Sequence, residues 1–153
     1  MQLRSVLYVS ESHVVFSEAE QQIASIAVTS RVNNELAGIT GCLVYTGTHF
    51  AQLIEGGSSA IGALLLRLQV DSRHHRMKIV ADTYRTIRAC PEWSMAYSRA
   101  PHLSGMIIRI AEGKAGGSDQ TVLAAILTQT VRNVLSQLTI SSLSTRANPW
   151  ANT

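Results

Sequence analysis

Three uncharged amide side chains lie close together in the sequence around one short turn and could recognise a polar planar ligand. Asn33 and Asn34 end the first predicted helix, and Gln52 lies on the second strand of the hairpin that follows the turn from Gly38 to Gly41. An amide offers both hydrogen-bond donors and acceptors. No nucleophile or set of metal ligands lies among the three, so the arrangement favours ligand recognition over hydrolysis.

Each of these amides also has an ordinary structural explanation. Asparagine is common where helices end and in turns, so Asn33 and Asn34 could act only as caps. Gln52 alternates with the apolar residues Phe50 and Ile54 on its predicted strand. An unpaired amide among them would cost about 1–3 kcal/mol. A bound ligand could supply the missing partners, and so could the peptide backbone.

The elements that would position these residues follow a recognisable order. Runs rich in β-branched and aromatic residues predict five strands, at residues 3–9, 42–45, 49–55, 77–83 and 93–97. Helical spacing predicts one helix after a capping box from Ser17 to Glu20 and another from Ser58 or Ser59 to about Val70. The order β-α-β-β-α-β-β predicts an α+β, ferredoxin-like fold, with a five-stranded mixed sheet and two helices on one face.

The last third of the sequence predicts helices outside that core. Residues 102–111 have helical character, and a helix from about 120 to 138 carries an apolar stripe. The stripe comprises Val122, Leu123, Ile126, Leu127, Val131, Val134, Leu135 and Leu138. We expect these C-terminal helices to pack on the open face of the sheet, with a partner chain as the alternative. The expected division is a domain at 1–98, a helical extension at 99–140 and a mobile tail at 141–153.

Composition narrows the classes of function. The 153 residues are 46% hydrophobic and 15% charged, which suits one domain with a substantial core. The net charge is +3, but the basic residues are scattered apart from residues 73–76, so no nucleic-acid partner is expected. No apolar run approaches the roughly 20 residues of a membrane span, and no signal peptide is evident. We expect a cytoplasmic protein in which Cys42 and Cys90 are buried, reduced thiols.

Six short motifs, taken together and in order, resemble the BLUF domain, a blue-light sensor that uses FAD. They are L-Y-V-S around Tyr8, S-R-V-N-N at 30–34, G-I-T-G at 38–41, F-A-Q-L-I-E-G at 50–56, R-L-Q-V-D-S-R-H-H at 67–75 and W-S-M at 93–95. The resemblance covers residues from about 3 to 97. Cys90 replaces a frequent aromatic residue and Ala51 a larger apolar one. We expect these departures to alter the recovery rate and to leave photoactivity intact.

The resemblance implies a flavin between the two helices, with FAD as the expected cofactor and FMN or riboflavin as alternatives. Asn34 would bind the pyrimidine edge of the ring, with Asn33 near it. Arg67 and Asp71, four residues apart, would contact the carbonyl edge and the ribityl side, and His74 the ribityl or phosphate region. The implied flavin-binding residues are Ser30, Asn33, Asn34, Gln52, Arg67, Asp71 and His74, with Ile26 and Leu68 as a hydrophobic wall.

The resemblance also implies a photochemical pair, Tyr8 and Gln52. Excited flavin is a strong oxidant, so light would drive electron and proton transfer from Tyr8 through Gln52 to the flavin. The return of both would leave Gln52 rearranged, with a new hydrogen bond to a flavin carbonyl and a slightly red-shifted absorption. The signal would pass through Trp93 and Met95 on the fifth strand into the C-terminal helices.

Two other classes of function compete with the sensor. A flavin-dependent redox enzyme is disfavoured because the sequence has no G-x-G-x-x-G turn for a nicotinamide cofactor. A ferredoxin-like protein without flavin would leave Asn34 and Gln52 with structural roles alone. We therefore expect no enzymatic activity. Because no cyclase or phosphodiesterase sequence follows residue 100, we expect output through contacts with an unknown downstream protein or through homo-oligomer formation, which is common in short proteins of this family.

Overall fold

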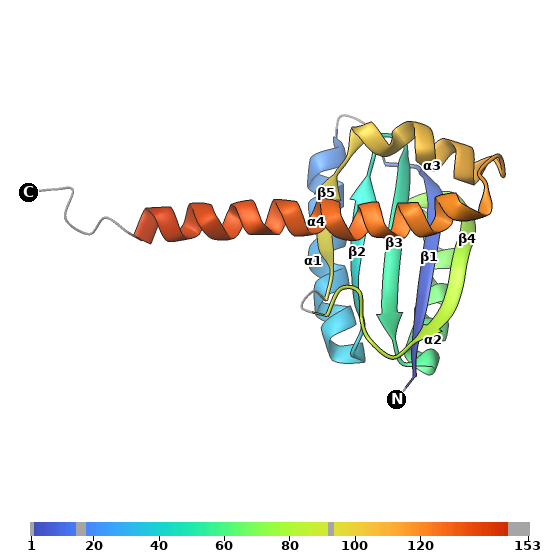
Figure 1. Cartoon of the computed structure of the whole chain (residues 1–153), viewed down its shortest axis with the longest axis horizontal. Helices are drawn as coiled ribbons and strands as arrows, with labels where there is room; N and C mark the ends of the chain where they lie inside the picture. Colours follow the sequence, from blue (N-terminus) through green and yellow to red (C-terminus); the bar gives the residue numbers. More distant parts are fainter. Residues whose placement is uncertain (1, 15–17, 92–93, 147–153) are drawn as a thin grey trace, which may run out of the picture.

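A computed structural model describes residues 2–14, 18–91 and 94–146 of the chain. The side chains at positions 117, 130, 131, 134, 135 and 137–146 lie outside that description. The elements, shown in Figure 1, are β1 (Leu3–Ser12), α1 (Ala19–Ala37), β2 (Thr40–Tyr45), β3 (His49–Gly56), α2 (Ser58–Gln69), β4 (His74–Arg85), β5 (Ala96–Arg99), a short 3-10 helix (Pro101–Leu103), α3 (Ser104–Ala111) and α4 (Gly117–Arg146).

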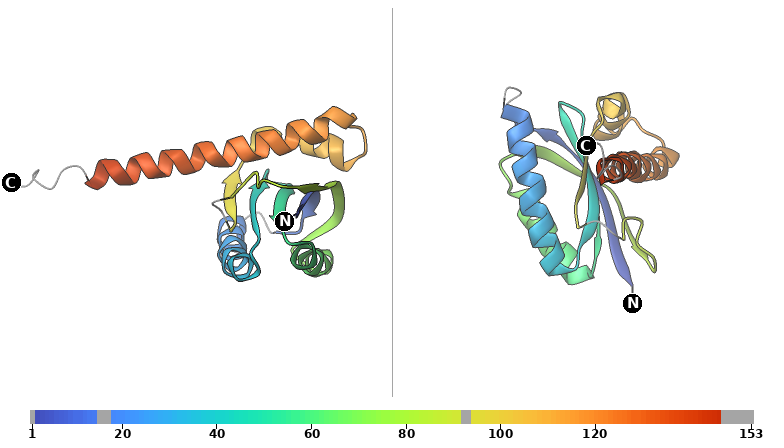
Figure 2. Two further views of the ribbon diagram at one scale, coloured as in Figure 1. Left: turned by 60° about the horizontal axis from the view of Figure 1, so that its bottom comes forward. Right: turned by 90° about the vertical axis from the view of Figure 1, so that its left-hand side faces the viewer.

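The five strands form one mixed sheet in the order β4-β1-β3-β2-β5. All neighbouring pairs are antiparallel except β2 and β5, which are parallel. Helices α1 and α2 cover one face, and α3 and α4 lie on the other (Figure 2, left). This arrangement confirms the predicted ferredoxin-like fold, with its two helices on one face and the C-terminal helices on the other.

The alternation of β3 sorts its side chains between the two faces. Ile54 is buried with the residues of α1 and α2, whereas Ala51 and Leu53 are buried with those of α3 and α4. Leu123 and Leu127 of α4 are fully buried in the second group. Part of the predicted apolar stripe therefore packs on the open face of the sheet. Its members at positions 131, 134, 135 and 138 lie beyond the described side chains.

Helix α4 is longer than the sequence predicts. It continues to Arg146, past the expected end near residue 138 and into the segment expected as a tail. Its C-terminal half projects beyond the sheet (Figure 1). No proline interrupts the sequence between residue 117 and Pro149, and an interior proline is the strongest local helix breaker. None of the helices within the described residues combines the length and apolar character needed to cross a membrane.

Helix α1 continues past the two asparagines that were expected to end it. It runs to Ala37, and Gly38 caps it in the left-handed conformation with φ of 67°. The Gly38 amide donates to carbonyl groups of the last helical turn. Glycine adopts this backbone conformation without the strain that a Cβ introduces. Asn33 and Asn34 therefore lie inside the helix and point in different directions.

The fifth strand begins later than expected. β5 starts at Ala96, so Met95 precedes the strand instead of lying within it, and Trp93 lies outside the described residues. The backbone carbonyls of Ser94 and Met95 accept hydrogen bonds from α1 side chains instead of from a neighbouring strand. These contacts hold residues 94 and 95 against α1, so pairing with the sheet begins only at Ala96.

Candidate functional site

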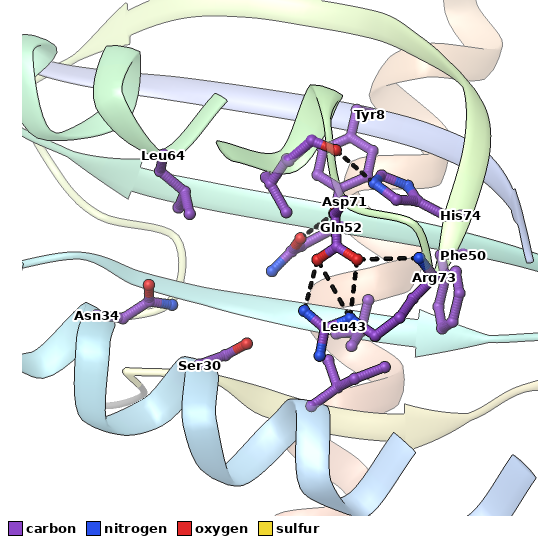
Figure 3. A pocket seen from close by; sticks show the side chains of 12 residues that line it. Tyr8, Ser30, Asn34, Leu43, Phe50, Gln52, Leu64, Asp71, Arg73 and His74 are labelled. Carbon is purple, nitrogen blue, oxygen red and sulfur yellow. Dashed lines mark hydrogen bonds and ion pairs between the residues drawn. The ribbon is translucent and has the colours of Figure 1, made fainter. Parts of the chain in front are cut away.

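A pocket lies between α1 and α2 against the sheet, as Figure 3 shows. Its lining residues are Tyr8, Ile26, Ser30, Asn34, Leu43, Phe50, Gln52, Leu64, Leu68, Asp71, Arg73 and His74. Strands supply Tyr8 and Gln52, while the helices supply apolar walls on both sides. The structure thus brings together most of the residues expected to bind a flavin, from segments that are far apart in the sequence.

Tyr8 and Gln52 form the centre of this pocket. The two residues lie directly opposite each other on β1 and β3, as expected from their neighbouring strands. The Tyr8 hydroxyl donates a hydrogen bond to Gln52 Oε1. Both side chains are buried, and burial, with a smaller contribution from the Asp71 charge, raises the pKa of Tyr8 far above its ordinary value. The phenol is therefore held in its protonated form.

The other end of the Gln52 amide faces Met95. Gln52 Nε2 donates to Met95 Sδ at 3.4 Å, and Met95 is itself buried. A thioether sulfur is a weak acceptor. Gln52 therefore bridges a phenol and a thioether, with a strong partner at its oxygen and a weak partner at its nitrogen.

Asn34 connects the pocket with the segment before β5. Its side chain is buried, lines the pocket and donates through Nδ2 to the Ser94 carbonyl at 2.8 Å. Arg31, one helical turn earlier, donates through Nε to the Met95 carbonyl at 2.9 Å. Asn33 is exposed and does not line the pocket, because consecutive residues of a helix point about 100° apart.

Asp71 pairs with Arg73, two residues further along the chain. The Arg73 guanidinium donates through Nε to Asp71 Oδ1 at 2.9 Å, and the Arg73 backbone amide donates to the same oxygen at 3.0 Å. These bonds lower the pKa of Asp71. Arg67 is exposed and outside the pocket lining. Helical i,i+4 spacing fails here because α2 ends at Gln69.

His74 is fixed at both ring nitrogens. Nε2 lies 2.7 Å from the Leu68 carbonyl and Nδ1 lies 2.7 Å from Ser10 Oγ. A carbonyl oxygen can only accept, so Nε2 carries a hydrogen, while the Ser10 hydroxyl can either donate to Nδ1 or accept from it. The imidazole ring lies 6.1 Å from the Tyr8 ring, centroid to centroid. His74 therefore forms a rigid wall of the pocket beside Tyr8.

Four lining residues were absent from the expected site. Leu43, Phe50 and Leu64 supply apolar surface, and Arg73 supplies the partner of Asp71. Arg73 had a detectable signal, since an aspartate often accepts from the backbone amide two residues ahead in a turn. The apolar three resemble any other core residue in sequence, so only the three-dimensional arrangement identifies them.

A second set of contacts fixes the loop that leads toward Met95. Arg88 donates through Nη2 to the Gly38 carbonyl at 2.9 Å and through Nη1 to the Glu55 carbonyl at 2.9 Å.

Cys42 and Cys90 are buried and form no disulfide, as expected. Within the described part of the chain, no group of three or more His, Cys, Asp or Glu side chains could hold a metal ion.

Comparisons with known proteins agree with this geometry. A family model described as "Sensors of blue-light using FAD" (BLUF) matches residues 3–96. The chain is 29% identical over 103 residues to the photoactivated adenylate cyclase subunit alpha of Euglena gracilis, covering 67% of this chain and 10% of that protein. It is 30% identical over 93 residues to the subunit beta of Euglena longa, covering 61% and 11%. The chain thus spans about a tenth of the length of these relatives.

Solved structures give the same result for the fold. The dark-state structure of BlrB, described as a BLUF protein, superposes with a TM-score of 0.69 at 31% identity, covering 85% of this chain and 95% of that one. The BlsA ground state superposes with a TM-score of 0.70 at 22% identity, covering 84% and 88%. The BlsA likeness concerns the fold alone.

Proposed function

The chain belongs to the BLUF family, the sensors of blue light that use FAD, and from this premise we propose that Tyr8 and Gln52 are its photochemical pair. Membership of the family makes it a flavin-dependent photoreceptor. The observation that carries the proposal is the hydrogen bond from the Tyr8 hydroxyl to Gln52 Oε1, buried in a pocket with apolar walls.

The residues of the pocket suit a flavin. Ile26, Leu64 and Leu68 provide apolar surface for the ring faces, and the amides of Asn34 and Gln52 provide hydrogen bonds for a polar edge. The cavity between the side chains is about 60 Å³, below the about 300–1,000 Å³ of typical ligand pockets, so a bound ring requires rim side chains to move. When bound, FAD absorbs blue light and becomes a strong oxidant.

Tyr8 is suited to give up an electron and a proton together. Its raised pKa keeps the proton on the phenol in the dark. Loss of an electron makes a phenol strongly acidic, and the proton then has a path along the existing bond to Gln52 Oε1. We propose that the electron and the proton both return to Tyr8, which restores the neutral phenol and leaves only hydrogen bonds changed.

Gln52 is suited to hold a changed hydrogen-bond arrangement after the electron and the proton have returned. Rotation or tautomerisation of its amide exchanges the donor and acceptor ends. The bond from Nε2 to Met95 Sδ at 3.4 Å is weak, so releasing it costs little. In the proposed signalling state, Gln52 donates to a carbonyl of the cofactor, and the absorption shifts slightly to the red until the protein relaxes.

Met95 is the proposed first relay of the signal. A change at Gln52 alters its contact with Met95, whose backbone Arg31 holds to α1. Asn34, which lines the pocket, holds the adjacent Ser94 in the same way. β5 begins at the next residue and α3 and α4 follow it. We therefore propose residues 1–98 as the sensor and the C-terminal helices as the output, acting through contacts with another protein and without catalysis of their own.

A light-minus-dark absorption spectrum of a Gln52→Ala variant tests the proposal. The wild type should show a reversible red shift of the flavin bands, and Gln52→Ala should retain flavin and show none. Asn34→Ala and Asn33→Ala provide a matched pair for the binding site, because one amide lies in the pocket and its neighbour is exposed. Only Asn34→Ala should weaken flavin retention. A red shift that survives Gln52→Ala would exclude Gln52 as the switch.

A further inference from the structure

A groove runs along α4 on the face of the sheet opposite the flavin pocket. One wall is α4 itself, from Gln120 to Arg132, and the rest of the lining comes from Leu53 of β3, from β4 and from Ala89. In Figure 1, α4 crosses the sheet and leaves the lower parts of β1, β3 and β4 without a covering helix. The groove holds about 550 Å³, within the about 300–1,000 Å³ of typical ligand pockets.

The groove is elongated, because the residues that α4 contributes repeat with the period of the helix. They lie at positions 120, 121, 124, 125, 128, 129 and 132 and so form one stripe. From Gln120 to Arg132, a rise of about 1.5 Å per residue gives about 18 Å, the length of about five or six residues of extended chain. A compact small molecule would contact one part of this stripe, whereas an extended peptide can follow all of it.

The charged side chains among the described residues that line this groove are two arginines. Arg85, at the end of β4, and Arg132 of α4 are both exposed. Neither forms an ion pair with another described residue. Glu55 lies on the same face of the sheet, but it is 1% exposed and accepts hydrogen bonds from backbone amides. The groove therefore offers two guanidinium groups to an anionic ligand, and a guanidinium binds a carboxylate through two parallel hydrogen bonds.

The uncharged part of the lining favours a peptide over a small polyanion. Thr83 and Thr121 carry hydroxyls and Gln120 carries an amide, and all three residues are exposed. Hydroxyls and amides both donate and accept, so they can pair with the N–H and C=O groups of a peptide backbone, whereas a polyanion would use only their donors. No aromatic side chain lies among the described lining residues, so a nucleotide base would have no ring on which to stack.

We propose that this groove binds an acidic, extended segment of a partner protein, with Arg85 and Arg132 each holding one carboxylate of the segment. The choice of a protein as the partner rests on the proposed output of the C-terminal helices, whereas the shape and the charge of the groove do not. Positive charge along the groove attracts an acidic segment and repels a basic one, so it selects the partner by sign.

Arg132 also connects the groove with the light-sensing side of the sheet. Its Nη2 donates to the Ala89 carbonyl at 3.0 Å, and Ala89 lies in the loop between β4 and β5 that leads to Met95. A movement of that loop would therefore change how Arg132 is placed for a carboxylate. By the same linkage, a bound segment would favour one arrangement of the loop.

Peptide selection on the full chain with bound flavin, kept in the dark, tests the proposal. Peptides enriched from a random library should carry two or more Asp or Glu residues. In fluorescence anisotropy with one such labelled peptide, Arg85→Glu and Arg132→Glu should each raise the dissociation constant by at least about 10-fold, because each variant replaces an attraction by a repulsion. Enrichment of basic or uncharged peptides, or of none, overturns the proposal.

Lys114→Glu is the matched control for net charge. Lys114 is 71% exposed, pairs with Glu112 and lies between α3 and α4, outside the groove lining. Its replacement changes the net charge by the same amount as each arginine variant and should leave the dissociation constant nearly unchanged. Equal weakening by all three variants would show that only the net charge of the chain matters, and would overturn the proposal.

Charge reversal of the peptide separates a lost contact from lost folding. A peptide whose acidic residues are replaced by lysine should bind the double variant Arg85→Glu, Arg132→Glu more tightly than the wild type. A lysine peptide that binds both proteins equally, or prefers the wild type, overturns the proposal. Citrate tests a small anion as the occupant. If citrate displaces the labelled peptide at lower concentration than the unlabelled peptide does, the groove is a small-anion site and the choice of a peptide is wrong.

Light-minus-dark spectra of the same samples keep this proposal apart from the proposed photochemistry. Gln52→Ala should still bind the acidic peptide in the dark, because the pocket and the groove lie on opposite faces of the sheet. A red shift in a protein that binds no acidic peptide refutes the groove alone. Peptide binding by a wild type that shows no red shift refutes the photochemical pair alone.

Discussion

Glu55 is a buried carboxylate that holds the loop leading toward the pocket, and its replacement gives a quantitative test of that loop. The side chain is 1% exposed and lies on β3, on the opposite face from Gln52. It accepts hydrogen bonds from the backbone amides of Ala89 at 2.9 Å and Cys90 at 3.2 Å. These residues precede the segment that places Met95 against Gln52. Glu55→Ala should therefore affect both stability and the light response.

The magnitude follows from the two amides that lose their acceptor. A buried donor without a partner costs about 1–3 kcal/mol, so Glu55→Ala should lower the free energy of unfolding by about 2–6 kcal/mol. In a domain of this size, 1 kcal/mol shifts Tm by about 2–4 °C, so a loss near 3 kcal/mol lowers Tm by about 6–12 °C. Glu55→Gln retains one oxygen acceptor and should cost less.

Circular dichroism during thermal and urea unfolding measures this difference. All samples should be in the dark with the same excess of flavin, because a ligand that binds only the native state raises its apparent stability. Glu20→Ala is the control. Glu20 is 88% exposed and pairs with Arg99 at 3.3 Å, and exposed pairs contribute about 0–1 kcal/mol. If Glu55→Ala proves as stable as Glu20→Ala, the loop does not depend on this carboxylate.

Three further predictions concern the pocket. Arg73 lowers the pKa of Asp71 in the folded protein, so the ionised carboxylate stabilises the fold above its ordinary pKa near 4. This stability is lost as the pH falls through the folded pKa. In urea unfolding, Asp71→Asn should therefore lose less stability than the wild type below about pH 4. Burial raises the pKa of Tyr8, so its contribution to the free energy of unfolding is complete below the ordinary pKa of about 10 and falls as the pH rises further. Between about pH 10 and 11, the free energy of unfolding should therefore fall more steeply for the wild type than for Tyr8→Phe. Met95→Leu keeps the side-chain volume and should cost less than about 1.5 kcal/mol of stability, but it removes the sulfur that accepts a hydrogen bond from Gln52. Dark recovery, followed by absorption after a flash, should therefore be slower in this variant. An unchanged rate would contradict a role for the contact.

The positions of Tyr8 and Gln52 could be predicted because they depend only on the alternation of side chains along a strand and on which strands are neighbours. Side chains two residues apart share a face of a strand, and the hairpin and the first strand supply the middle of the sheet. Tyr8 and Gln52 then face the helices from adjacent strands, as the register confirms. The order of elements and the covering of the open face by α4 followed from equally local patterns of apolar residues.

The contacts at the ends of helices could not be predicted in the same way. Arg67 and Asp71 were both expected beside the flavin, but α2 ends between them and the chain turns so that Arg73 reaches the carboxylate. The resemblance placed Asn33 near the flavin together with Asn34, but α1 continues past both residues to Ala37. One helical step then separates the buried Asn34 from its exposed neighbour. A small error in a boundary changes the face on which a residue lies.

The contacts that fix the loop before β5 have no local sequence pattern at all. Arg88 bonds backbone carbonyls of residues 33 and 50 positions away in the chain, and Glu55 bonds backbone amides 34 and 35 positions away. Such partners are backbone groups, which every residue possesses. Only the completed fold shows which of them an arginine or a glutamate reaches.

The light-minus-dark spectrum of Tyr8→Phe tests the central claim most directly. Phenylalanine keeps the ring and removes the hydroxyl that donates to Gln52 Oε1. Tyr45→Phe is the matched control, because Tyr45 is also buried on the same side of the sheet, donates to the Gly47 carbonyl and lies outside the pocket lining. With equal flavin content, wild type and Tyr45→Phe should show the reversible red shift and Tyr8→Phe should show none. A red shift of normal size in Tyr8→Phe would contradict the account.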